Sequence, residues 1–265
     1  MAWPVQTLLA SDGPERAFAV DNTLLVSLSQ QLAAFRSMDV VANNIANVST
    51  PGFKREGTKF EEFLTRMKPS ETEKGPQLVS FVVDKGTVRD QTAGRVEQTG
   101  APFDLAVNGK GYFVVQTPTG DRYTRDGHFQ LDPDGNLVTS DGNKVMGEGG
   151  ELSFAPDDGD IHISQDGTIT GAHGQLGKVR LVSFDDEAGM KMEGSNTYST
   201  AESPKPADKG LIRQGMLESS NVEPVVEISH MIEITRAYQL TANLTKSQQD
   251  LMTQADQKLG AMPNG

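Results

Sequence analysis

Apolar residues recur at spacings of three and four near the N-terminus, which is the period of one helix face. The stripe consists of Leu25, Leu28, Leu32, Phe35, Met38, Ala42 and Ile45. Asp21 or Asn22 can cap its start, because either side chain can accept a hydrogen bond from a free N–H group of the first turn. Pro51 and Gly52 then stop helical backbone and permit a reversal. The pattern predicts a helix over about residues 22–48.

The end of this helix is unusually rich in asparagine. Asn43, Asn44 and Asn47 interrupt the apolar positions of the stripe. Asparagine is a mediocre helix former, because its amide competes for backbone hydrogen bonds. We therefore expect these amides to bond to neighbouring chains or to backbone groups, and the helix to complete its structure against other subunits.

A second helical pattern closes the chain. After Pro224, which suits a first helical turn, the seam is Ile234, Ala237, Thr241, Leu244, Gln248, Leu251 and Ala255. Gly260 and Pro263 end it. Because the seam mixes polar with apolar residues, it is marginal as an isolated hairpin. We expect Leu28, Leu32, Phe35 and Met38 to pair with Ile234, Leu244 and Leu251 within one subunit.

Between the helices the hydrophobic period changes to two, the period of a strand. Short strands are predicted at residues 105–107, 112–116, 128–131, 137–139, 161–164, 168–170 and 179–184. Turn sequences such as Asn108-Gly109 and Asp141-Gly142 separate them. The predicted fold is α+β: a coiled-coil-like layer of terminal helices (residues 21–53 and 214–260) and a mainly antiparallel β domain (96–195). Residues 54–95 and 196–213 are predicted connectors.

Composition narrows the partners. The net charge of −12 argues against nucleic acid and against insertion into an anionic membrane. No stretch approaches the roughly 20 apolar residues of a membrane-spanning helix. With no cysteine, disulfides and thiolate chemistry are excluded. Residues 1–20 lack the basic region of a secretory signal. They are either a disordered extension or the product of a start site placed too early, with translation beginning at Val20.

The search for catalytic residues finds none. The four histidines are scattered, without metal-ligand spacing. Residues 132–136 superficially suggest a calcium loop but lack its central glycine and closing glutamate, which favours a β-turn. The acidic run at residues 185–187 is typical of a solvated loop. We therefore expect neither an enzyme nor a cofactor or metal site.

Several motifs in order resemble the rod proteins of the bacterial flagellum, a family of axial proteins. They are residues 42–53 (ANNIANVSTPGF), 108–113 (NGKGYF), 123–127 (YTRDG) with 134–138 (DGNLV), 215–222 (GMLESSNV) and 231–238 (MIEITRAY). The resemblance covers about residues 21–260. It is nearest to the proximal rod type, with the distal rod type as a close alternative and the longer hook type as a weaker one.

This resemblance implies a structural role. Terminal helices of such proteins form the inner layer of a tube around the export channel, and the β domain forms the outer layer. The subunits leave the cell unfolded through the flagellar type III export apparatus, without a cleavable signal peptide. The rod they form crosses the periplasm and transmits torque. Partners would be other rod proteins and copies of the same chain. A secreted adhesin or tail-fibre module, and a carbohydrate-active β protein, are the alternatives from other classes.

The expected assembly interface combines the apolar stripes with the asparagine motif. Its residues are Leu28, Leu32, Phe35, Met38, Asn43, Asn44, Asn47, Phe53, Ile234, Tyr238, Leu244 and Leu251.

Overall fold

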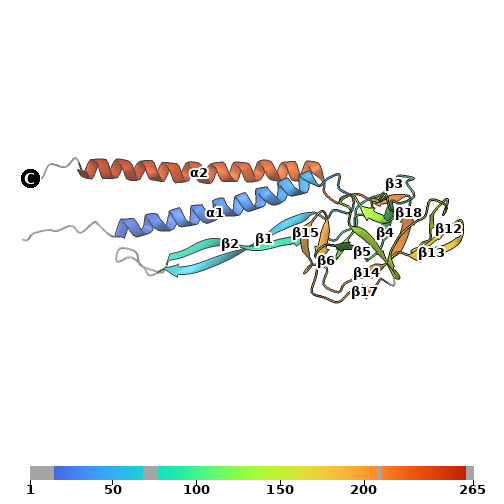
Figure 1. The fold of residues 1–265 in the computed structure, drawn as a ribbon. Coiled ribbons are helices and arrows are strands. Elements are labelled where there is room, and N and C mark those ends of the chain that lie inside the picture. The colour runs from blue at the N-terminus through green and yellow to red at the C-terminus, as the bar shows by residue number, and fades with distance from the viewer. Residues whose placement is uncertain (1–14, 68–76, 208–209, 261–265) are drawn as a thin grey trace, which may run out of the picture. The chain divides into compact units, whose positions relative to one another are not determined.

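The computed structural model describes residues 15–67, 77–207 and 210–260 (Figure 1). They form two compact units. The helical unit comprises the described parts of residues 1–41, 58–87 and 229–265. The β unit comprises residues 42–57 and the described part of 88–228. The predicted α+β class is confirmed, because a helix near each end of the chain flanks an antiparallel β region.

Both predicted helices are present. Helix α1 spans Glu15–Ala46 and α2 spans Pro224–Gly260. Helix α1 starts earlier than the predicted residue 22 and includes residues 15–20 of the predicted extension, whereas residues 1–14 lie outside the described residues. Helix α2 starts at Pro224 as predicted, since proline suits the first helical turn, where its missing N–H group costs no bond.

Strands occupy most of the region between the helices. The first two are long: β1 (Glu56–Met67) and β2 (Gln77–Arg89). Those from residue 96 to 151 are β3 (Val96–Gln98), β4 (Leu105–Asn108), β5 (Tyr112–Thr117), β6 (Gly120–Thr124), β7 (Phe129–Leu131), β8 (Leu137–Thr139), β9 (Lys144–Gly147) and β10 (Gly150–Glu151). The later ones are β11 (His162–Ile163), β12 (Thr168–Gly171), β13 (Gly174–Lys178), β14 (Leu181–Ser183), β15 (Lys191–Gly194), β16 (Thr197–Ser199), β17 (Lys205–Pro206), β18 (Leu211–Gln214) and β19 (Met216–Glu218).

The largest sheet of the β unit has the order β15-β16-β6-β5-β9-β8-β7, with β10 beside β9, β14 beside β5 and β17 beside β14. A three-stranded sheet, β11-β12-β13, lies apart from it in pairing. Two short pairs use the end of the β region: β18 with β4, and β19 with β3. The pairings of known register are antiparallel.

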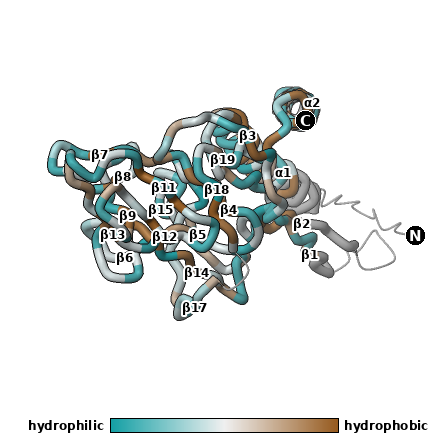
Figure 2. Tube along the Cα trace, turned by 90° about the vertical axis from the view of Figure 1, so that its right-hand side faces the viewer, coloured by the Kyte–Doolittle hydropathy of each residue, from teal (hydrophilic) through white to brown (hydrophobic). Residues whose placement is uncertain are grey.

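Strand β5 carries the core because it is buried on both faces. Phe113 and Val115 contribute to one apolar cluster, and Tyr112 and Val114 to a second on the opposite face. This division follows from the strand geometry, since successive side chains point to opposite faces. Figure 2 shows hydrophobic stretches lying among the strands of the β unit. The predicted strands within residues 105–184 are all found, with small shifts at their ends.

The residues predicted as connectors contain strands. Residues 54–95 include the β1–β2 ribbon, and residues 196–213 include β16, β17 and most of β18. In the second segment the buried anchors are Tyr198 and Ile212. Tyr198 has polar neighbours on both sides, and Ile212 has one apolar neighbour, Leu211, so neither belongs to a period-two pattern over several residues.

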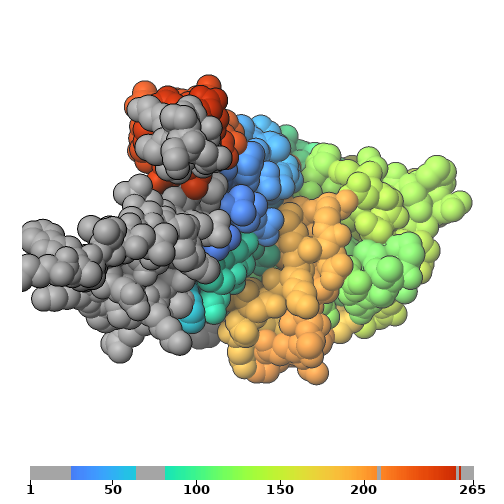
Figure 3. All heavy atoms as spheres, turned by 90° about the vertical axis from the view of Figure 1, so that its left-hand side faces the viewer, coloured from blue at the N-terminus to red at the C-terminus, as the bar shows by residue number. Residues whose placement is uncertain are grey.

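In the helical unit, α1 lies against both the ribbon and α2. Figure 3 shows atoms of α1, in blue, directly against the ribbon, in teal. Arg36 of α1 forms an ion pair with Asp84 of β2 at 3.4 Å. The rings of Phe35 and Tyr238 meet edge to face, with centroids 4.9 Å apart. Neither described helix is long and apolar enough to cross a membrane.

The turn after α1 depends on Gly52. Its φ of +67° lies in the left-handed region, and a Cβ there would come within 2.4 Å of the Arg125 carbonyl group. Its backbone N–H donates to the Glu218 carbonyl oxygen at 2.7 Å. Both the backbone conformation and the close approach of another segment therefore require glycine.

We expect Gly52→Ala to destabilise the β unit by on the order of 3–4 kcal/mol, because it adds a clash to a strained backbone. Gly142→Ala is the matched control, since Gly142 has φ +81° but open space where its Cβ would lie. The control should lose only about 1–2 kcal/mol, the cost of left-handed backbone alone. Urea unfolding measures both, and equal losses would contradict the argument.

Candidate functional sites: a buried polar junction and exposed helix faces

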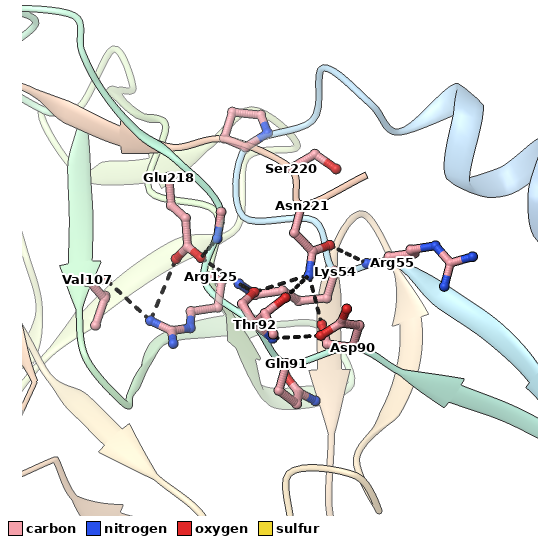
Figure 4. Close-up of polar contacts among 12 residues, drawn as sticks. Lys54, Arg55, Asp90, Gln91, Thr92, Val107, Arg125, Glu218, Ser220 and Asn221 are labelled. Carbon is pink, nitrogen blue, oxygen red and sulfur yellow. Dashed lines mark hydrogen bonds and ion pairs between the residues drawn. The ribbon is translucent and has the colours of Figure 1, made fainter. Parts of the chain in front are cut away.

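A cluster of charged and amide side chains lies in the β unit, where the chain leaves α1 and enters α2; most members are buried, and Arg55 and Asn221 are partly exposed. We call it the polar junction. Its members are Asn44, Lys54, Arg55, Arg125, Glu218, Asn221 and Glu227. Figure 4 shows the part around Lys54 and Glu218.

The centre of the junction is an ion pair between Lys54 and Glu218. Lys54 Nζ donates to Glu218 Oε1 at 2.5 Å, and each residue is only 2% exposed. Lys54 Nζ also donates to the Thr92 carbonyl oxygen at 2.8 Å. Glu218 Oε1 accepts a further bond from the backbone N–H of Gly94 at 2.9 Å. The pair is therefore desolvated and held by additional hydrogen bonds, as burial of charges requires.

Arg125 is a second cation at the same carboxylate. Its Nη1 lies 3.7 Å from Glu218 Oε2, and its Nη2 donates to the Gly109 carbonyl oxygen at 2.8 Å. Burial lowers the pKa of Lys54, and the neighbouring Arg125 charge lowers it further, whereas the bond to Glu218 opposes both effects. Two buried cations thus depend on one carboxylate.

A second carboxylate, Glu227, links the ends of the two helices. It lies in the first turn of α2 and is fully buried. Its Oε1 accepts a bond from Arg55 Nε at 2.6 Å, and its Oε2 accepts one from Asn44 Nδ2 at 3.0 Å. The Asn44 amide also bonds to both backbone groups of Glu56, at 2.8 and 2.9 Å. The Asn44 amide therefore occupies the backbone N–H and carbonyl oxygen of Glu56, as a neighbouring strand would.

Asn221 completes the junction by holding three segments together. Its Oδ1 accepts a bond from the Arg55 backbone N–H at 2.6 Å. Its Nδ2 donates to the carbonyl oxygens of Asp90 and Thr92, at 3.0 and 3.1 Å. The segment after α1, the segment after β2 and the segment before α2 are fixed to one another by this single amide (Figure 4).

The asparagine motif that the sequence analysis assigned to the interface is divided by the structure. Asn44 and Phe53 are fully buried within the β unit. Asn43 is exposed. Asn47 donates to the Asn43 carbonyl oxygen at 2.9 Å and accepts a bond from Thr50. The amide of Asn44 thus has its partners inside the chain, and contacts of the other asparagines with neighbouring subunits stay a prediction.

The helix faces differ from the junction in being exposed. On α1, Leu28 is 51% and Leu32 60% exposed; on α2, Leu244 is 67% and Leu251 65% exposed. The contacts that join the helices are near the middle of the pattern, where Phe35 packs on Tyr238 and Thr235 approaches Met38 Sδ at 4.0 Å. Met38 and Ile234 are half-buried. The predicted pairing of the leucines within one subunit is therefore incomplete in the single chain.

Comparison with known proteins finds similarity in three parts of the chain: the first helix, the central β region and the C-terminal helix. Three family models match: a flagella basal body rod protein model at residues 24–54, a flagellar hook protein FlgE/F/G D1 domain at 106–171, and a flagellar basal body rod FlgEFG C-terminal model at 213–258. The chain is 41% identical to the flagellar basal-body rod protein FlgF of Caulobacter vibrioides over 91% of this chain and 99% of that protein. The chain belongs to the flagellar basal-body rod protein family.

Two further rod proteins are similar to this chain at lower identity. FlgF of Mesorhizobium japonicum is 32% identical over 91% of this chain and 99% of its own length. FlgG of Buchnera aphidicola subsp. Acyrthosiphon pisum is 34% identical over 83% of this chain and 93% of its own length.

The motifs that carry the resemblance to the rod family meet in the polar junction. Asn44 belongs to the first motif, Arg125 to the third, and Glu218 and Asn221 to the fourth. Gly109, whose carbonyl oxygen accepts from Arg125, belongs to the second. The last motif, residues 231–238, instead provides the α2 side of the contact with Phe35. Segments far apart in the sequence thus share one buried network.

The sequence analysis placed none of Lys54, Arg55, Arg125, Glu218, Asn221 and Glu227 in a buried network; Asn221 is predictable from sequence only as a possible cap of the second helix. In a single sequence a lysine or glutamate is expected at the surface, because burying a charge is costly. A signal was nevertheless present, since three of these residues lie inside quoted motifs. Motif positions that are charged and lack any catalytic context are candidates for buried pairs.

The two neighbouring asparagines provide a matched test. Asn44→Ala removes the three hydrogen bonds of a fully buried side chain, two to the Glu56 backbone and one to Glu227, so we expect a loss of about 2–4 kcal/mol in unfolding free energy. Asn43→Ala, at an exposed position, should change stability by less than about 0.5 kcal/mol. Chemical denaturation of both variants measures the difference. Similar stability of the two would contradict the role given to Asn44, and rod assembly with Asn43→Ala tests the interface role.

Proposed function

We propose that this chain is a structural subunit of the flagellar basal-body rod, of the proximal type, which assembles with other rod proteins and with copies of itself. Family membership supports the rod assignment. The observation that carries the mechanism is the exposed leucine stripe on each terminal helix. Such stripes on a chain of net charge −12 are expected to be covered by other protein surfaces.

Burial of the stripes supplies the driving force for assembly. Leu25, Leu28 and Leu32 follow one face of α1, and Leu240, Leu244 and Leu251 one face of α2. Each of these side chains is more than half exposed. Fully burying a leucine contributes about 1.5–3 kcal/mol, so the six together can outweigh a large entropy of association. Contacts between different faces of successive subunits build an open helical array, which suits a shaft.

The polar junction would give each subunit mechanical continuity. The backbone beside α1, the start of α2 and the strands of the β unit are joined by buried ion pairs and by Asn221. The helix ends that belong to the β unit, residues 42–46 and 224–228, are therefore bonded directly to its other segments. We propose that this serves transmission of torque.

The resemblance to the family supports the remaining parts of the proposal. The subunit is exported unfolded by the flagellar type III apparatus, without a cleavable signal peptide, and takes its place in a rod that crosses the periplasm. It carries out no reaction. The Asn43 and Asn47 amides, at the junction end of α1, are proposed to contribute to contacts with neighbouring subunits.

Charged substitutions on the α2 stripe test the proposal. Leu244→Asp with Leu251→Asp should leave the isolated subunit folded, because both side chains are exposed, but should abolish rod assembly and swimming in a strain that lacks the native gene. Gln239→Asp with Gln249→Asp is the matched control, since it adds the same charge on the other side of α2. Swimming in soft agar and isolation of basal bodies are the readouts. Normal motility with the leucine variant, or equal impairment by both pairs, would rule out this face as the interface.

A further inference from the structure

The last part of the β unit does more than lead into α2. Residues 211–227, which we call the closing segment, pair with strands from the beginning of the unit. Strand β18 pairs with β4, from Leu211 opposite Asn108 to Gln214 opposite Leu105. Strand β19 pairs with β3, from Met216 opposite Gln98 to Glu218 opposite Val96. Without the closing segment, β3 and β4 lose these partners.

The closing segment also fills the core. Ile212 is 1% exposed and belongs to the same apolar cluster as Leu105, Phe113 and Ile169. Next to it, the Gln214 side chain accepts a bond from the Ile163 backbone N–H at 3.0 Å and donates to the carbonyl oxygens of Pro102 and Ile161, at 2.9 and 2.8 Å. One side chain therefore joins β11 to the segment before β4.

The charged groups of the polar junction depend most strongly on the closing segment. Glu218 is the carboxylate that lies against Lys54 and Arg125, and Glu227 is bonded to Arg55 and Asn44. Before the closing segment docks, Lys54 and Arg125 lack the Glu218 carboxylate, so burying them would leave Arg125 as a cation without this partner and would favour loss of the Lys54 proton, both of which are unfavourable. In the native structure, Glu218 bonds to Gly52, Lys54 and Gly94, so residues 52–55 and 92–95 both lose partners when it is absent.

We propose that the closing segment is a folding gate: the β unit does not acquire its native packing until residues 211–227 are in place. The strands within residues 105–199 then cannot fold ahead of the rest of the chain. The biological role of this folding gate rests on the proposed function. A subunit that must pass through a narrow export channel benefits if neither end can fold without the other, and the junction needs residues 44–55 as much as residues 218–227.

Pulse-labelling hydrogen exchange during refolding of the full chain tests the gate. A brief unfolding step keeps the prolyl bonds in their native isomers, so that slow isomerisation does not interfere. We expect the amides of β5 and β6 to become protected with the same rate constant as those of β18 and β19. Protection of β5 and β6 in an earlier phase would overturn the proposal, because the core would then form without the closing segment.

Two variants test whether the Glu218 carboxylate controls the rate at which the β unit acquires its native packing. Glu218→Gln removes the charge that Lys54 and Arg125 require, and Glu97→Gln, on the paired strand β3, removes an exposed one. Glu218→Gln should slow protection of β5, β6, β18 and β19 by the same factor, whereas Glu97→Gln should leave all of them at the wild-type rate. Slowing confined to β18 and β19 would overturn the proposal. If Glu218→Gln does not fold, the wild-type experiment still decides. Neither result depends on rod assembly, so failure of the gate and failure of the proposed function are distinguishable.

Discussion

The Glu218 carboxylate, placed between the Lys54 ammonium and the Arg125 guanidinium, is the constraint on which the β unit depends. All three groups are nearly excluded from water. Buried charges contribute little net stability when they are paired, but they impose a large penalty on arrangements that leave one of them alone. Such an interaction therefore selects one arrangement of the chain. Here it requires the segment after α1, the loop after β6 and the end of β19 to meet at one point.

The polar junction and the helix stripes have different structural roles. Most of the junction's polar groups bond within the chain: Asn44 with Glu56 and Glu227, and Asn221 with Arg55, Asp90 and Thr92. Glu218 Oε2 and Arg125 Nε are buried without a hydrogen bond, and there the two residues face each other only as an ion pair. The helix stripes do the opposite and leave their leucines exposed. The junction therefore finds most of its bonding partners within the chain, whereas the helices leave apolar side chains that only other surfaces can cover. That combination suits a component whose final stability comes from its neighbours.

The sequence predicts those parts of the fold that repeat locally. Both helices and the central strands were found because a period of three to four or of two extends over several residues. The β1–β2 ribbon was not, because its sequence is highly charged and weakly patterned, with exposed pairs such as Glu61 with Lys85. The junction was missed for another reason: Lys54 and Glu218 are 164 positions apart, and nothing local distinguishes a lysine that will be buried from one that will not. Asn44 was recognised as unusual, but its partner Glu227 became visible only in three dimensions.

The central claim is that the subunit keeps its polar junction closed and uses its helix stripes for assembly. A structure of the assembled rod at a resolution that shows side chains tests it most directly. We expect Leu28, Leu32, Leu244 and Leu251 to be buried against helices of the same or neighbouring subunits, with the Lys54–Glu218 and Asn44–Glu227 contacts unchanged from those of the single chain. Leucines that face solvent in the rod, or an Asn44 amide released from Glu227 to bond with another subunit, would contradict it.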